Sequence, residues 1–158
     1  MKIITGINGF GRFGLHLLKY YLDRYDDSNF QISYINDDFL TIEEAQNIIC
    51  NDTKVNFIRY KVLIENNIIV IKTPEGLIHN FVYSCKSAIK IPWMTKVHFL
   101  LECSGKNTDR NSALKLLNDN LAHVIISATS QDPDATLVYG YNHLDYKKSQ
   151  KIISYGSC

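Results

Sequence analysis

Gly9-Phe10-Gly11-Arg12-Phe13-Gly14 is the segment from which the fold of this 158-residue chain can be argued most directly. It places glycine in the pattern GxGxxG. The β-branched run 2–7 precedes it and predicts a buried strand. After it, apolar residues recur every three or four positions over 12–25, which is the period of an amphipathic helix. The segment therefore lies at a predicted strand-to-helix turn, the context in which this glycine pattern indicates dinucleotide binding.

Each glycine of this turn has a separate predicted role. Gly9 makes the tight turn, Gly11 lets the backbone approach a pyrophosphate, and Gly14 lets the helix pack closely on the strand. The phosphates then meet free amides at the helix N-terminus. The alternative is a glycine-rich turn that serves only packing.

An acidic residue is expected at the end of the following strand, where it can accept a hydrogen bond from a ribose hydroxyl. The alternating run 31–35 predicts that strand, and Asp37 follows it, 23 residues after Gly14. Its carboxylate is expected to favour NAD and to repel the 2′-phosphate of NADP. The alternative is a solvated acidic turn, since Asp38 comes next.

The middle of the chain predicts a helix and then a β meander. Thr41 and Glu44 form a capping box, so a helix is expected from Thr41 to about residue 50. The β-rich runs 59–64, 68–72 and 77–81 are separated by two good turn signals, which predicts a hairpin or meander at the periphery of the fold.

The remainder alternates strands with one helix. A helix is predicted over 108–117, and the apolar runs that predict strands are 97–101, 124–127, 136–139 and 151–154. Strands separated by helices, with several runs apolar on both faces, indicate an α/β fold: a Rossmann-type, doubly wound, mostly parallel sheet with a small β meander. Residues 1–158 are expected to form one domain.

Composition excludes several other classes. The chain is 46% hydrophobic and 21% charged, so a sizeable core is expected. Its 17 basic and 16 acidic residues give no electrostatic basis for binding nucleic acid or an anionic membrane. No apolar run approaches the roughly 18 residues of a membrane span, so the cytoplasm is expected. The spacing of the four cysteines predicts reduced thiols and no metal site.

Five blocks of sequence resemble the glyceraldehyde-3-phosphate dehydrogenase family, with erythrose-4-phosphate dehydrogenase as a close relative. They fall in the family's order with similar spacing. The resemblance covers the whole chain but only about the first half of a family member, so a catalytic domain is expected to be absent from residues 1–158. The blocks are Gly6-Ile7-Asn8-Gly9-Phe10-Gly11-Arg12, Ile35-Asn36-Asp37, Val124-Ile125-Ile126-Ser127-Ala128, Gly140-Tyr141-Asn142-His143 and Lys151-Ile152-Ile153-Ser154-Tyr155-Gly156-Ser157-Cys158.

The resemblance implies that the chain binds NAD and names the residues that bind it. Asp37 holds the adenosine ribose, Ser104 and Gly105 lie beside the cofactor, and Ser127 lies beneath its nicotinamide side. Around the pyrophosphate it implies contacts from Asn8, Gly9, Gly11, Arg12 and Phe13.

Cys158 aligns with the family's nucleophile. The implied reaction is attack on a sugar-phosphate aldehyde, hydride transfer to NAD and cleavage of the resulting thioester by phosphate. The family's histidine base and substrate-phosphate groups have no counterpart here, so the isolated chain is expected to be inactive. A homo-oligomer is also implied, although the sequence leaves the oligomeric state open.

Departures from the family concentrate near the reacting end of the cofactor. Tyr155 replaces a small polar residue, and Lys106-Asn107 replaces an apolar residue and an aromatic one. These favour, as an alternative, a catalytically inactive nucleotide-binding or assembly module derived from the family. A third interpretation is a different Rossmann enzyme, such as a semialdehyde dehydrogenase or a methyltransferase.

Overall fold

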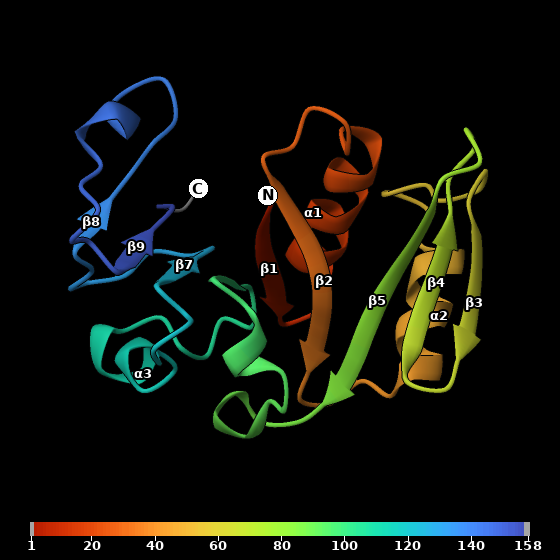
Figure 1. The fold of residues 1–158 in the computed structure, drawn as a ribbon, viewed down its shortest axis with the longest axis horizontal. Helices are drawn as coiled ribbons and strands as arrows, with labels where there is room; N and C mark the ends of the chain where they lie inside the picture. The colour runs from red at the N-terminus through yellow and green to blue at the C-terminus, as the bar shows by residue number, and fades with distance from the viewer. Residues whose placement is uncertain (1, 157–158) are drawn as a thin grey trace.

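The computed structural model describes residues 2–156, which form one nine-stranded sheet flanked by three α-helices (Figure 1). The sheet order is β3-β4-β5-β2-β1-β6-β7-β9-β8. The helices are α1 (Arg12–Asp23), α2 (Ile42–Asn51) and α3 (Arg110–Leu114). The strands are β1 (Ile3–Asn8), β2 (Phe30–Asp37), β3 (Lys61–Glu65), β4 (Ile68–Lys72), β5 (Ile78–Cys85), β6 (Phe99–Glu102), β7 (His123–Ile126), β8 (Ala135–Thr136) and β9 (Ile152–Ser154).

The pairing pattern confirms the predicted doubly wound α/β fold. Strands β5, β2, β1, β6, β7, β9 and β8 pair in parallel. The two ladders that join β3, β4 and β5 are antiparallel. The strand order reverses beside β1, where the chain goes first to β2 on one side and later to β6 on the other. Ligands of open α/β sheets bind at the carboxyl ends of the strands at such a switch point.

The β meander is an extension of the main sheet. Strands β3 and β4 lie toward one edge, as expected of a peripheral hairpin. β5 lies farther in, because Tyr34 to Asp37 of β2 pair in parallel with Val82 to Cys85. The carboxyl end of β5 is therefore beside that of β2, which brings residues 84–86 to the switch-point edge.

Two elements are only about half as long as the sequence predicts. The helical pattern 108–117 forms α3 only over Arg110–Leu114, since the chain turns after Lys115. The strand predicted at 136–139 is reduced to Ala135–Thr136, since Asn142 then accepts from the Val138 amide and donates to the Thr136 carbonyl to close a turn. None of the helices within residues 2–156 is long and apolar enough to cross a membrane.

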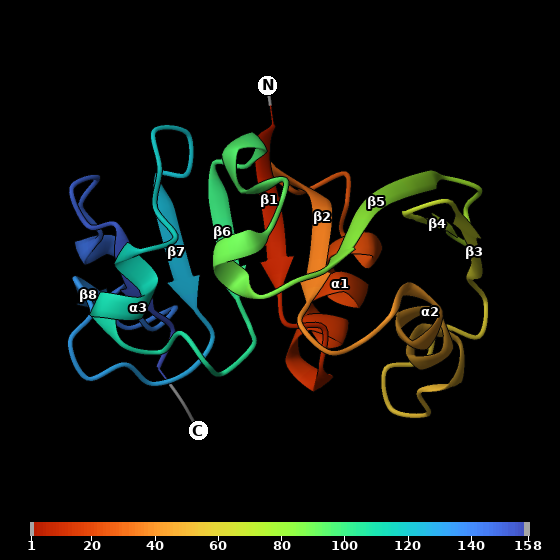
Figure 2. The same ribbon diagram turned by 90° about the horizontal axis from the view of Figure 1, so that it is seen from below.

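Two hydrophobic cores cover opposite faces of the sheet. One lies under α1 and α2, which are adjacent in Figure 2, and includes Ile7 and Ile35. The other lies under α3 and the segment 88–97, and includes Leu100 and Val124. Alternation along a strand explains the division, because Tyr34 packs on the second core and its neighbour Ile35 on the first.

A glycine on β1 makes room for the largest buried side chain. A Cβ built on Gly6 would lie 2.4 Å from Cζ3 of Trp93, whose indole is 2% exposed and stacks on Tyr34 with 5.2 Å between ring centroids. The Trp93 indole nitrogen donates to the Ser84 hydroxyl at 2.9 Å, so the ring is fixed at both its apolar and its polar side.

We expect Gly6→Ala to lower the free energy of unfolding by about 1–3 kcal/mol, because the methyl group overlaps a ring that cannot move freely. Gly11→Ala is the control, since a Cβ there meets no atom within 4 Å. Urea denaturation of both variants measures the difference. Equal stability of the two variants would contradict the packing described for Trp93.

Candidate nucleotide-binding site

The glycine turn lies at the crossover from β1 to α1, as the sequence predicts. Gly9 has a φ of +94°, which favours glycine, and a Cβ on it would lie 2.3 Å from the Ser104 amide nitrogen. A Cβ on Gly14 would lie 2.3 Å from the Gly9 carbonyl oxygen. The turn, α1 and the segment after β6 therefore meet through backbone atoms alone.

The N-terminus of helix α1 has no side-chain cap. Its N-cap residue is Gly11, and the first turn contains no acidic residue. The first amides of a helix have no partner within it, so they point toward the space beside the turn. A Cβ on Gly11 would meet nothing within 4 Å. Gly11 therefore differs from Gly9 and Gly14, because no atom of residues 2–156 requires it to be glycine.

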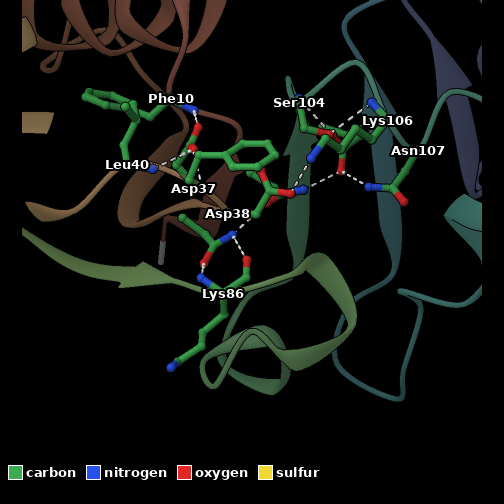
Figure 3. A network of polar contacts seen from close by, with 12 residues as sticks. Phe10, Asp37, Asp38, Leu40, Lys86, Ser104, Lys106 and Asn107 are labelled. Atoms are coloured by element: carbon green, nitrogen blue, oxygen red, sulfur yellow. Dashed lines mark hydrogen bonds and ion pairs between the residues drawn. The ribbon is translucent and has the colours of Figure 1, made fainter. Parts of the chain in front are cut away.

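The Asp37 carboxylate faces the glycine turn. Its Oδ2 accepts from the Phe10 amide at 2.8 Å, and its Oδ1 accepts from the amides of Phe39 and Leu40 at 2.9 and 3.1 Å (Figure 3). A carboxylate offers about four acceptor positions. One position on Oδ2 remains for a ribose hydroxyl, so Asp37 both fixes the turn and can still bind a ligand.

A buried polar network connects the carboxyl ends of β1, β2 and β6. The Asn8 amide nitrogen donates to Oε2 of Glu102 at 2.7 Å, and the Asn8 side-chain oxygen accepts from Asn36 at 2.8 Å. Asn36, fully buried, also donates to the Lys86 carbonyl at 2.8 Å and accepts from the Ser84 hydroxyl at 2.7 Å. These bonds fix the relative positions of the strand ends at the switch point.

Glu102 anchors the other end of this network. Its Oε1 accepts from both the amide and the hydroxyl of Ser104, and its Oε2 accepts from Asn107 at 3.0 Å as well as from Asn8. The carboxylate is 1% exposed and takes part in no ion pair within residues 2–156. Four donors therefore satisfy this buried charge, and in return it holds Ser104 against the glycine turn.

The other predicted ligand residues surround this edge. Gly105 turns with a φ of +72° after Ser104, and the Ser127 amide donates to the Glu102 carbonyl at 2.9 Å at the end of β7. Arg12 points instead to Asp52 at the end of α2, with 3.0 Å between charged atoms. The Phe13 ring meets Tyr155 edge to face at 6.5 Å between centroids.

Cys158, the predicted nucleophile, lies outside the described residues. Among residues 2–156, histidine, cysteine and acidic side chains form no group of three that could hold a metal ion.

Residues 3–110 match the family model described as "Glyceraldehyde 3-phosphate dehydrogenase, NAD binding domain". The chain belongs to this family. The recognised resemblance is thereby confirmed, and the switch-point edge just described is the edge of an NAD-binding domain. NAD is the cofactor of the family, as the sequence predicts.

Relatives match along almost the whole chain. The cytosolic glyceraldehyde-3-phosphate dehydrogenase of Mesembryanthemum crystallinum is 30% identical over 160 residues, which cover 99% of this chain and 45% of the plant protein. The enzyme of the same name from Mastigamoeba balamuthi is 33% identical and that from Pseudomonas aeruginosa 29%, each covering 100% of this chain and 46% of the relative. The chain therefore spans somewhat less than half the length of these relatives.

Sequence analysis missed Glu102 and the partners that join it to Asn8 and Asn36. A signal was present, because each of these polar residues ends an apolar strand run. Three such residues on neighbouring parallel strands are expected to meet at one edge. Their hydrogen bonds could not be read from the sequence, since Asn8 and Glu102 are separated by 94 positions.

We expect Asn36→Asp to destabilise the domain by about 3 kcal/mol, because an oxygen would then face the Asn8 and Lys86 acceptors inside the protein. Asn29→Asp, at an exposed position, is the control and should change the free energy of unfolding by less than about 0.5 kcal/mol. Urea denaturation at pH 7 checks both. If the two variants unfold alike, the buried network does not contribute as described.

Burial raises the pKa of the Cys103 thiol to about 12; the nearby Glu102 charge adds to this, and a hydrogen bond from Ser127 opposes it. At pH 8 its thiolate is then roughly a thousandfold scarcer than that of an unshifted thiol. Iodoacetamide should therefore alkylate the exposed Cys50 and Cys85 well before Cys103. Peptide mass spectrometry over time checks the order, and early labelling of Cys103 would contradict it.

Proposed function

We propose that residues 1–158 are the NAD-binding half of a phosphorylating aldehyde dehydrogenase of the glyceraldehyde-3-phosphate dehydrogenase type. The observation that carries the proposal is the open turn at Gly11, beside an uncapped helix start and within the matched NAD-binding domain. Backbone amides at such a turn are suited to bind paired phosphates.

The residues that would hold NAD divide into two groups by the type of contact. The first group would surround the pyrophosphate with backbone amides and the start of α1, and consists of Gly9, Gly11, Arg12 and Phe13. Asn8 would hold the beginning of this turn in place through its hydrogen bond to Glu102. Asp37 would accept from one ribose hydroxyl with its remaining Oδ2 position. That single position fits a ribose hydroxyl without breaking the bond to Phe10.

The reacting end of the cofactor would lie nearer β6 and β7. Ser104 and Gly105 would flank the cofactor, and Ser127 would lie below its nicotinamide side. Bound NAD supplies a hydride acceptor there. Cys158 is proposed as the nucleophile toward a sugar-phosphate aldehyde, on the motif alone.

The remaining parts of the reaction are proposed to come from a second half. The relatives are more than twice as long as the matched region, which leaves room for such a half. We propose a homo-oligomer and a cytoplasmic location, supported by relatives named as cytosolic. Neither glyceraldehyde 3-phosphate nor erythrose 4-phosphate is preferred as substrate.

The purified chain should bind NAD in a calorimetric titration, and Gly11→Ala should weaken binding about tenfold or more. The unfolding midpoint should fall only slightly, because alanine is a poorer N-cap than glycine but meets no steric clash. The added methyl group would keep phosphate oxygens from the amides, and hydrogen bonds to charged groups of this kind contribute about 1.5–3 kcal/mol. Alanine at Gly9 or Gly14 would clash with backbone atoms, so Gly11 is the glycine of this turn at which an effect on NAD binding can be measured without a steric clash in the protein.

Gly76→Ala is the control for this titration. Its Cβ also meets open space, but in the hairpin between β4 and β5, so the NAD affinity of the folded variant should stay at the wild-type value. Its φ of +94° makes alanine strained, so this variant controls for affinity and not for stability. Undetectable NAD binding by the folded wild-type chain would overturn the proposed function. NADH formation by the 158-residue chain alone, with phosphate and glyceraldehyde 3-phosphate, would overturn the assignment of catalysis to a second half.

A further inference from the structure

Lys106 departs from the family pattern, and its position differs from the sequence-based expectation. It lies beside Asp38 on the ribose-reading side of the site, not near the reacting end of the cofactor. The Lys106 ammonium pairs with the Asp38 carboxylate, which connects the segment after β6 with the segment after β2 (Figure 3). Both residues line a pocket of about 220 Å³, together with Ser104 and Asn107. Lys106 is therefore a cation on the wall of a pocket next to the predicted ribose ligand.

The site is less negative than the acidic pair Asp37-Asp38 suggests. Three backbone amides already donate hydrogen bonds to the Asp37 carboxylate. The Asp38 charge is compensated by Lys106. Lys86, the other lysine close to this network, directs its ammonium away from it (Figure 3). Lys106 is thus the lysine available to an anion here.

The ammonium is held in place but is not buried. It lies 3.9 Å from the centroid of the Phe39 ring, and half of the Lys106 side chain is exposed. Cation–π contact with the ring keeps the charge at this position when Asp38 is exchanged for another anion. Exposed ion pairs contribute little stability, so such an exchange is not costly.

We propose that Lys106 binds a phosphate on the adenosine ribose, so that the site accepts NADP as well as NAD. The inference rests on the proposed function, because it requires the adenosine half of a dinucleotide at Asp37. A phosphate dianion is a stronger partner for an ammonium than one carboxylate, and a nearby cation is the feature that admits a 2′-phosphate beside a Rossmann sheet. Asp37, whose carboxylate alone is expected to repel that phosphate, is retained, and the Lys106 charge beside it offsets the repulsion.

Parallel calorimetric titrations with NAD and with NADP test the proposal on the purified chain. The wild type should bind the two within about tenfold of each other, and Lys106→Met should weaken NADP binding about tenfold and NAD binding by less than about threefold. Lys106→Arg should restore NADP binding, because it restores the charge. Asp38→Asn, which frees the ammonium, should strengthen NADP binding relative to NAD.

Lys72→Met is the matched control, since it removes the same charge from an exposed position on β4. It should leave the ratio of the two affinities at the wild-type value. NADP binding more than tenfold weaker than NAD binding in the wild type overturns the inference, as does an equal loss of both in Lys106→Met. In either case the proposed function stands, whereas failure of the wild type to bind either dinucleotide overturns both.

Discussion

The contact between the Gly9 backbone and the segment after β6 is the constraint on which the rest of this structure depends. Because no side chain separates Gly9 from Ser104 or from Gly14, three parts of the chain approach at backbone distance. That approach puts the start of α1 at the point where the strand order reverses. The switch point, the open helix start and the ribose-reading carboxylate therefore come from one packing requirement.

The same edge shows how a polar interior can be tolerated. Burying the side chains of Asn8, Asn36 and Glu102 is unfavourable unless each polar atom has a partner. Here the partners come from neighbouring strand ends and from the loops that follow them, so the network is satisfied only when β1, β2 and β6 are in register. The network therefore favours one arrangement of the site over alternatives of similar hydrophobic burial.

Much of the fold could be predicted from local patterns. The strand, glycine turn and helix of residues 2–25, and the capping box of α2, each depend on residues close together in sequence. Two contacts could not be predicted, because each joins residues far apart in the sequence. They are the pairing of β5 with β2 and the packing of Trp93 on Gly6. For the site, the residue types at the glycine turn and at Asp37 were predictable. The backbone amides that donate to the Asp37 carboxylate and the ion pair of Lys106 were not, because both depend on how the loops turn after the strands.

Both edges of the nine-stranded sheet are poorly suited to accept another strand. β3 begins at Lys61 and ends at Glu65, both exposed, and β8 consists of only two residues. Charged and short edge strands discourage the edge-to-edge addition that leads to fibrils and open polymers. Association with further polypeptides is thereby directed to the faces of the molecule, where geometric fit can limit the number of subunits that join.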